Sequence, residues 1–250
     1  MRLNRSTPAL TGLLAVALVS LPTAADATRP FVTDDARVVD PKAAQLETWF
    51  QYHPDSDQQE FWALPAINPT DRVQGGVELT AGVANFWDTE GERRDEIIVQ
   101  AKTLFRELRP NDVGVGLVVG TALDLDSGNA LQDTQEGHFA WIPISVAIND
   151  KQTVLHNNIG VSHNRFSNAD DQTDFTWGIG IEHWLAPRLQ GVAEAFGEGH
   201  RESPFYQFGL RAWLVEDRVQ VDATYGSQFS GSSEENWVTL GVRLLTPAIL

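Results

Sequence analysis

The residues whose types could support catalysis lie in the segment 156–164, which reads His-Asn-Asn-Ile-Gly-Val-Ser-His-Asn. A serine hydroxyl becomes a nucleophile when a histidine within hydrogen-bonding distance accepts its proton. Ser162 and His163 are neighbours in the chain, so on a β-strand their side chains point to opposite faces. His156 shares a face with Ser162 but would lie about 20 Å away along the strand. We therefore predict no catalytic residue and a protein that is not an enzyme, and we retain a lipid hydrolase acting through these residues as an alternative.

The sequence evidence for a cofactor or metal site is weaker than that for catalytic residues. Gly114, Gly116 and Gly120 have the look of a phosphate-binding loop, but they alternate with apolar residues in an extended segment that no helix follows. The acidic clusters at 88–95 and 170–174 lack the ligand spacing of a calcium loop. The chain has no cysteine, which excludes disulfides, thiolate catalysis and cysteine-ligated metals. We predict no cofactor and no metal site.

Composition narrows the class of protein further. The chain has 250 residues, of which 42% are hydrophobic, so it is long and apolar enough to bury a sizeable core. Its formal net charge of −16 argues against nucleic acid as a partner, because nucleic-acid binders need a basic face.

Hydrophobic residues alternate with polar or small ones through most of the chain after residue 41, as in the runs 205–214 and 219–226. Side chains on a strand point alternately to two faces, so each run predicts a strand with one apolar and one polar face. Each run is near the ~9–11 residues that a tilted strand needs to cross a bilayer. We count about twelve strands, with approximate centres at Trp49, Leu64, Leu79, Ala101, Leu117, Ile144, Ile159, Ile179, Ala193, Leu210, Ala223 and Leu240.

The connections between these strands alternate in length. Short turns are expected at 109–112, 149–151, 186–188 and 216–218, with a slightly longer one at 68–74. Longer polar loops are expected at 54–60, 88–95, 126–136, 165–174, 198–204 and 228–235. An even strand count with short periplasmic turns and longer extracellular loops is typical of bacterial outer-membrane barrels. The predicted fold class is all-β, a closed antiparallel transmembrane β-barrel of about 12 strands.

If lipid covers the apolar faces, the opposite faces line the lumen. These faces carry ionisable groups of both signs: Glu47, Glu78, Lys102, Arg106, Glu182, Glu194, Arg211, Asp222 and Arg243. Such a lining can set selectivity for a permeant, or it can pair internally and hold the barrel shut. The opposite orientation, with the apolar faces inside, would make the chain a soluble periplasmic β-protein that binds an apolar ligand.

The first residues read as an export signal. Arg2 and Arg5 precede an apolar run, 10–21, that is too short to span a bilayer, and Ala25-Asp26-Ala27 fits a signal-peptidase site. The predicted organisation is a cleaved signal peptide at 1–27, a periplasmic N-terminal segment at 28–42 and an outer-membrane barrel at 43–250. The predicted location is the cell outer membrane of a Gram-negative envelope.

Short motifs resemble a known family. The segment 31–40 (Phe-Val-Thr-Asp-Asp-Ala-Arg-Val-Val-Asp), followed by 45–49 (Gln-Leu-Glu-Thr-Trp), is similar to the start of bacterial outer-membrane β-barrels described as transporter-like or MetA-pathway of phenol degradation proteins. The segments 62–66, 77–79 and 240–247 extend the resemblance over most of the mature chain. The resemblance implies a barrel that admits small molecules, aromatic ones among them, and it implies no catalytic residues.

Together these observations predict a passive or weakly selective outer-membrane channel for small solutes, including aromatic or hydrophobic ones. The expected partners are outer-membrane lipid and lipopolysaccharide, the barrel-insertion machinery and a small-molecule permeant. An outer-membrane lipid hydrolase and a soluble ligand-binding β-protein are the alternatives.

Overall fold

The computed structural model describes residues 30–89, 91, 93–125, 134–166, 170–199, 203–230 and 235–250. Within these residues the chain forms twelve strands, and each predicted strand centre falls inside one of them. They are β1 (Ala44–His53), β2 (Gln58–Ile67), β3 (Val77–Trp87), β4 (Arg93–Arg106), β5 (Val113–Asp124), β6 (Thr134–Ile148), β7 (Thr153–Phe166), β8 (Gln172–Ala186), β9 (Leu189–Glu198), β10 (Phe205–Val215), β11 (Val219–Gln228) and β12 (Asn236–Leu245). None of the described residues belongs to a helix long and apolar enough to cross a membrane.

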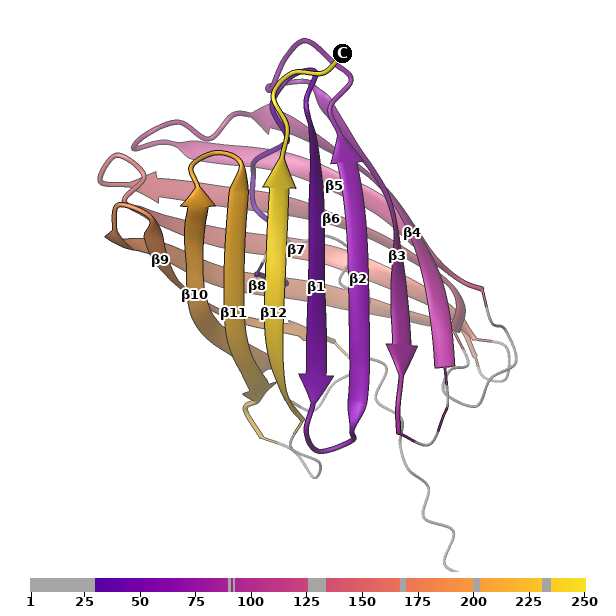
Figure 1. Ribbon diagram of the computed structural model, residues 1–250. Helices are drawn as coiled ribbons and strands as arrows, with labels where there is room; N and C mark the ends of the chain where they lie inside the picture. The colour runs from indigo at the N-terminus through magenta and orange to yellow at the C-terminus, as the bar shows by residue number, and fades with distance from the viewer. Residues whose placement is uncertain are drawn as a thin grey trace, which may run out of the picture.

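The twelve strands close into one barrel. Each strand pairs antiparallel with its neighbours in the chain, and β1 completes the ring by pairing with β12, with Trp49 opposite Gly241 (Figure 1). Closure gives every strand a hydrogen-bonded partner on both sides, so no sheet edge is left exposed. The predicted fold class is confirmed.

The connections gather at two ends of the barrel. The end reached after odd-numbered strands is called the loop end, and the end where β12 finishes and the C-terminus lies is called the turn end (Figure 1). Several connections differ from the lengths expected, among them the first two of the barrel. β1 and β2 are joined by only four residues, 54–57, because Asp57 adopts a left-handed conformation (φ 52°) that closes a tight turn. At the turn end the nine residues 68–76 join β2 to β3 and are organised by Asn68, whose side chain donates to the carbonyl oxygens of Val39 and Arg72.

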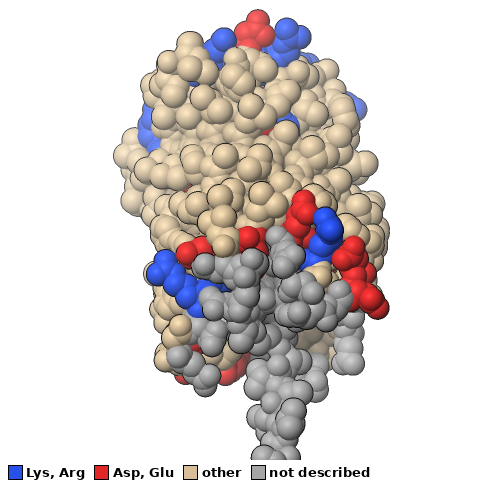
Figure 2. Space-filling model, turned by 90° about the vertical axis from the view of Figure 1, so that its right-hand side faces the viewer, with Lys and Arg blue, Asp and Glu red and all other residues tan. Residues whose placement is uncertain are grey.

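The outer surface of the barrel is apolar in its middle. Outward side chains near the strand centres, among them Ile159, Ile179 and Leu240, are 54%, 55% and 66% exposed. On the face drawn in Figure 2, a broad band without charged side chains separates charged groups near the two ends. Contiguous apolar surface of this kind is unfavourable in water and suits the hydrocarbon of a bilayer. The apolar faces therefore lie outside, which is the orientation expected for a membrane barrel and not for a soluble ligand-binding one.

This orientation predicts a depth-dependent penalty for charge on the outer face. Ile179→Arg, at the centre of β8, should lower the free energy of unfolding by about 2–4 kcal/mol in phospholipid vesicles, whereas Phe105→Arg, near the turn end of β4, should cost about 0–1 kcal/mol. Urea titration of the vesicle-inserted barrel measures both. Equal penalties at the two positions would contradict the assignment of the apolar band to the bilayer.

Candidate functional site

The lumen gathers most of the ionisable residues singled out in the sequence. The structure places eight of the nine on inward-facing positions: Glu47, Glu78, Lys102, Glu182, Glu194, Arg211, Asp222 and Arg243. Arg106 is the exception and corrects the prediction. A bulge between Leu104 and Arg106 in the pairing of β4 with β5 interrupts the alternation, so Arg106 sits half-exposed near the turn end and pairs with Asp112.

The chain before β1 lies inside the barrel, which corrects the prediction of a separate periplasmic segment at 28–42. Residues 30–40, called the inner segment here, run through the lumen and reach the turn end before β1 begins (Figure 1). Phe31, Asp34, Asp35, Ala36 and Val39 are each no more than 3% exposed. The inner segment therefore fills part of the space that a solute would have to cross.

Side chains of the barrel wall satisfy the backbone of the inner segment. Glu194 accepts hydrogen bonds from the backbone N–H groups of Val32 and Thr33, both at 2.7 Å. Ser145 Oγ accepts one from Ala36 at 2.8 Å, and Glu78 Oε2 accepts one from Val39 at 2.6 Å. A buried N–H without a partner costs about as much as a lost hydrogen bond, so these four bonds hold an extended segment that has no strand partner.

A chain of ion pairs fixes the middle of the inner segment. Lys102 Nζ lies 2.6 Å from Asp34 Oδ1 and 3.3 Å from Asp35 Oδ1. Arg37 pairs with Asp35 and also lies 3.0 Å from Glu182, whose same oxygen is 2.7 Å from Arg211. All but Arg37 are almost fully buried, and burying such charges is favourable only when they are paired and hydrogen-bonded. The lumen charges of β4, β8 and β10 thus serve first as partners of the inner segment.

Glycines on the inward faces make room for the inner segment. A Cβ atom at Gly178 would lie 2.4 Å from Thr33 Oγ1, and one at Gly114 would lie 2.9 Å from Ala36 Cβ. Both contacts are far inside normal packing distances. The sequence pattern of glycines along β5 and β8 therefore reflects a close approach between the wall and the inner segment.

A second polar group joins the first and last strands. Arg243 Nε on β12 lies 3.1 Å from Glu47 Oε1 and 2.9 Å from Gln45 Oε1 on β1. Asp222, on β11, lies so close that a Cβ at Gly241 would be 2.6 Å from its carboxylate oxygens. This group supports the seam at which the barrel closes.

One side of the lumen is apolar, which the sequence reasoning missed. Trp49 and Trp62 stack with ring centroids 5.1 Å apart, and Phe86 meets Trp62 edge-on at 5.5 Å. Together with Ile98 and Val118, they belong to a buried cluster on the inner faces of β1 to β6. A signal was available, because Trp49, Trp62 and Phe86 each fall on the same alternation as a charged lumen residue of their own strand.

The residues considered for lipid hydrolysis are not assembled. His156 Nδ1 bonds to Ser145 Oγ at 2.9 Å, deep in the lumen beneath the inner segment. Ser162 lies six residues further along β7, and His163 points outward and bonds to Thr173. The described residues therefore form no serine–histidine pair on a surface that lipid can reach.

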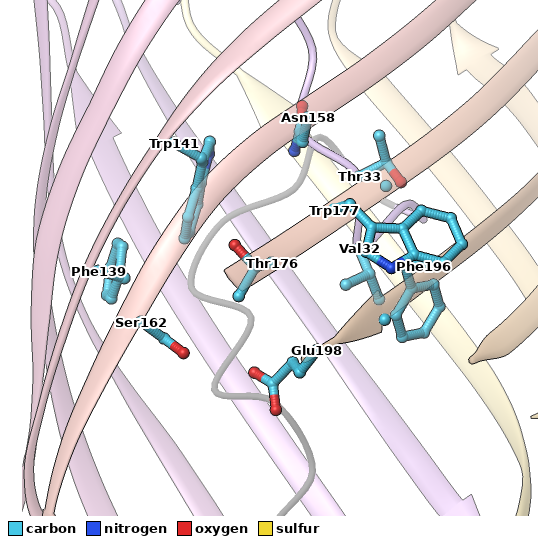
Figure 3. Close-up of a pocket in the computed structure, with 12 residues that line it drawn as sticks. Val32, Thr33, Phe139, Trp141, Asn158, Ser162, Thr176, Trp177, Phe196 and Glu198 are labelled. Atoms are coloured by element: carbon cyan, nitrogen blue, oxygen red, sulfur yellow. The ribbon is translucent and has the colours of Figure 1, made fainter. Parts of the chain in front are cut away.

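A pocket opens between the inner segment and the loop-end half of β6 to β9. It contains about 540 Å³ of empty space, including solvent at its open side. Phe139 and Trp141 lie on one side, Val32 and Phe196 on the other, and the side chain of Glu198 reaches its rim (Figure 3). The pocket is thus a continuation of the apolar side of the lumen, with the inner segment as part of its wall.

The fold is that of outer-membrane β-barrels, and two solved porins share it. The NanC porin aligns with a TM-score of 0.61 and 9% identity over 80% of this chain and 98% of its own. The KdgM porin in complex with disordered oligogalacturonate aligns with a TM-score of 0.55 and 8% identity over the same shares. At this identity the likeness concerns the architecture alone.

The chain belongs to the family described as Uncharacterised conserved protein UCP029691, whose model matches residues 15–245. No curated protein matches the sequence. The resemblance to MetA-pathway barrels is therefore supported at the level of an outer-membrane barrel, and the narrower assignment stays a prediction.

The ion pairs of the inner segment predict what holds it in place. Lys102→Met leaves Asp34 and Asp35 buried with one cation fewer, which should destabilise the seated segment by about 3 kcal/mol. A Val39→Cys substitution in this cysteine-free chain reports seating through its rate of maleimide labelling, which should rise roughly 100-fold in the Lys102→Met background. Lys151→Met, in the turn after β6, is the matched control and should leave the rate unchanged. Equal labelling in all backgrounds would show that Lys102 does not hold the segment.

Proposed function

We propose that this protein is a passive, weakly selective channel for small solutes in the bacterial outer membrane, narrowed by its own inner segment. The observation that carries the proposal is the combination of a closed barrel, an apolar outer band and an inner surface rich in polar and ionisable groups. A barrel of this kind offers water-soluble molecules a lined path through a bilayer. The two structural neighbours named as porins support the same reading.

The lumen favours small solutes with apolar parts. Trp49, Trp62, Phe86 and Phe139 give the side formed by β1 to β6 an aromatic surface, on which hydrophobic or aromatic solutes can slide without losing contact. The buried lumen charges of the strands comprise eight acids and three bases among the described residues. Such a lining disfavours anions, so an acidic oligosaccharide like the one bound to KdgM is a poor candidate for the solute here.

The proposed channel implies a location in the outer membrane and a set of partners there. Residues 1–27 would direct export and be removed by signal peptidase, and the barrel would then be inserted by the barrel-insertion machinery. Outer-membrane lipid would cover the apolar band. Lipopolysaccharide in the outer leaflet would contact the barrel at the loop end, where Glu136, His138 and Arg165 form an outward polar cluster.

Planar-bilayer recording tests the channel. The full-length mature protein should produce discrete conductance steps, and Lys102→Met should raise the mean step because the released inner segment no longer narrows the path. Lys151→Met should match the unmodified protein. A folded barrel that is silent in the bilayer, with and without the Lys102 substitution, would overturn the proposal while leaving the fold intact.

A further inference from the structure

The pocket beside the inner segment has one flat aromatic wall. Phe139 and Trp141 lie two residues apart on β6, so both rings face the lumen, and their centroids are 4.7 Å apart with 15° between the ring planes. The indole N–H of Trp141 donates to Asp34 Oδ2 at 3.2 Å, a bond at the edge of the ring that fixes its orientation and leaves its face free. A planar apolar group can therefore replace water on a surface that is already formed.

The lining of this pocket is almost entirely uncharged. Of its twelve described lining residues only Glu198 is ionisable, and this residue stands at the rim (Figure 3) and already interacts with another group of the protein. Val32 and Phe196 close the side opposite the aromatic wall. A charged group that moved into such surroundings would lose its hydration without gaining a counter-ion of its own. The lining therefore favours an uncharged solute.

One buried hydroxyl in the pocket has no hydrogen-bond partner among the described residues. Ser162 lies directly opposite Phe139 in the pairing of β6 with β7, is 8% exposed, and makes no hydrogen bond through its Oγ. Figure 3 shows this oxygen turned towards the pocket. Buried hydroxyls in folded proteins are nearly always hydrogen-bonded, and a serine hydroxyl can both donate and accept. A polar group on a solute stacked against Phe139 would thus meet Ser162 Oγ.

We propose that the pocket binds a small uncharged aromatic solute that carries one hydroxyl group. The ring of the solute would lie against the faces of Phe139 and Trp141, and its hydroxyl would form a hydrogen bond with Ser162 Oγ. The inference rests on the proposed channel function, because it names the class of solute that the channel would hold on its path and the side chain that would select it.

An NMR titration of the full-length mature protein in detergent tests the site with four probes of similar size: benzyl alcohol, cyclohexylmethanol, benzylammonium and benzoate. Cyclohexylmethanol keeps the hydroxyl but lacks an aromatic face, so it should bind about fivefold more weakly than benzyl alcohol. The two ions should bind at least about tenfold more weakly. Titration of protein-free micelles supplies the background from the detergent. Equal binding of the two alcohols, binding of either ion as tight as that of benzyl alcohol, or no binding of benzyl alcohol would overturn the proposal.

Two variants locate the binding on the structure. Ser162→Ala should weaken benzyl alcohol binding about fivefold and leave toluene, which has no hydroxyl, unaffected. Phe139→Leu should remove the preference for benzyl alcohol over cyclohexylmethanol. Ser227→Ala is the matched control, because Ser227 is also 8% exposed but lies on β11, and it should bind like the unmodified protein. Heat-modifiable gel migration shows that each variant is folded, and equal affinities in the two serine variants would overturn the assignment of the hydroxyl to Ser162.

The inner segment supplies a second readout that does not depend on conduction. Val32 and Thr33 belong both to this segment and to the pocket lining, so a bound solute contacts the segment only while it is seated. Benzyl alcohol at ten times its dissociation constant should therefore slow the maleimide labelling of Val39→Cys about tenfold. An unchanged labelling rate at that concentration would overturn the placement of the solute against the inner segment.

The bilayer separates failure of the site from failure of the channel. A conducting barrel in which benzyl alcohol fails both the titration and the labelling experiment overturns the site and leaves the channel. A barrel that is silent in the bilayer but binds benzyl alcohol with the expected dependence on Ser162 overturns the channel and leaves the site.

Discussion

The arrangement of the lumen depends on one constraint, which is that an extended chain buried inside a barrel must find a partner for each of its polar groups. The inner segment has no strand beside it, so its N–H groups are received by Glu194, Ser145 and Glu78. Its own acids then require cations, which Lys102 and Arg37 supply. Removing one member of such a set leaves the others buried and unpaired, which costs far more than the pair contributes when intact. The primary role of the charges on the lumen wall is therefore to bind the inner segment, and any effect on a solute is secondary.

The same constraint explains why the lumen has two different sides. Buried carboxylates, glutamines and arginines line β8 to β12 and β4, as with Glu182, Gln207 and Arg211, and further carboxylates lie on β1 to β3, at Glu47, Glu60 and Glu78. The inner faces of β1 to β3 and β5 to β6 carry Trp49, Trp62, Phe86 and Phe139, which belong to one apolar cluster, and the indole N–H of Trp62 donates to Glu60 within it. A solute moving along the barrel would thus meet hydrocarbon and aromatic faces on one side and hydrogen-bonding groups on the other. This contrast favours molecules that have both an apolar part and a polar or charged end.

The sequence predicted the barrel well because the strand signal is local. Alternation of period two needs only neighbouring residues, and it located all twelve strands and the outward side chains such as Ile179 and Leu240. Arg106 was placed wrongly because one bulge shifts the alternation, and a bulge leaves no mark in the pattern of residue types. The inner segment was missed for a different reason. Val32 and Glu194 are 162 residues apart, and Ala36 and Ser145 are 109 apart, so no local pattern reports that they meet.

The glycines show how such long-range information can still be present in a sequence without being readable. Gly178 and Gly180 on β8 leave space for Thr33 and Phe31, and Gly114 on β5 leaves space for Ala36. From the sequence, Gly114 indicated only a position in an extended segment, since no local pattern identifies the group that lies against it. The structure supplies that group, and with it a coupling between the inner segment and the pocket. Val32 and Thr33 form part of the pocket wall while Glu194 holds their backbone. A molecule that binds in the pocket against these residues must favour the seated segment over the released one, and a seated segment must in turn favour that molecule by the same free energy.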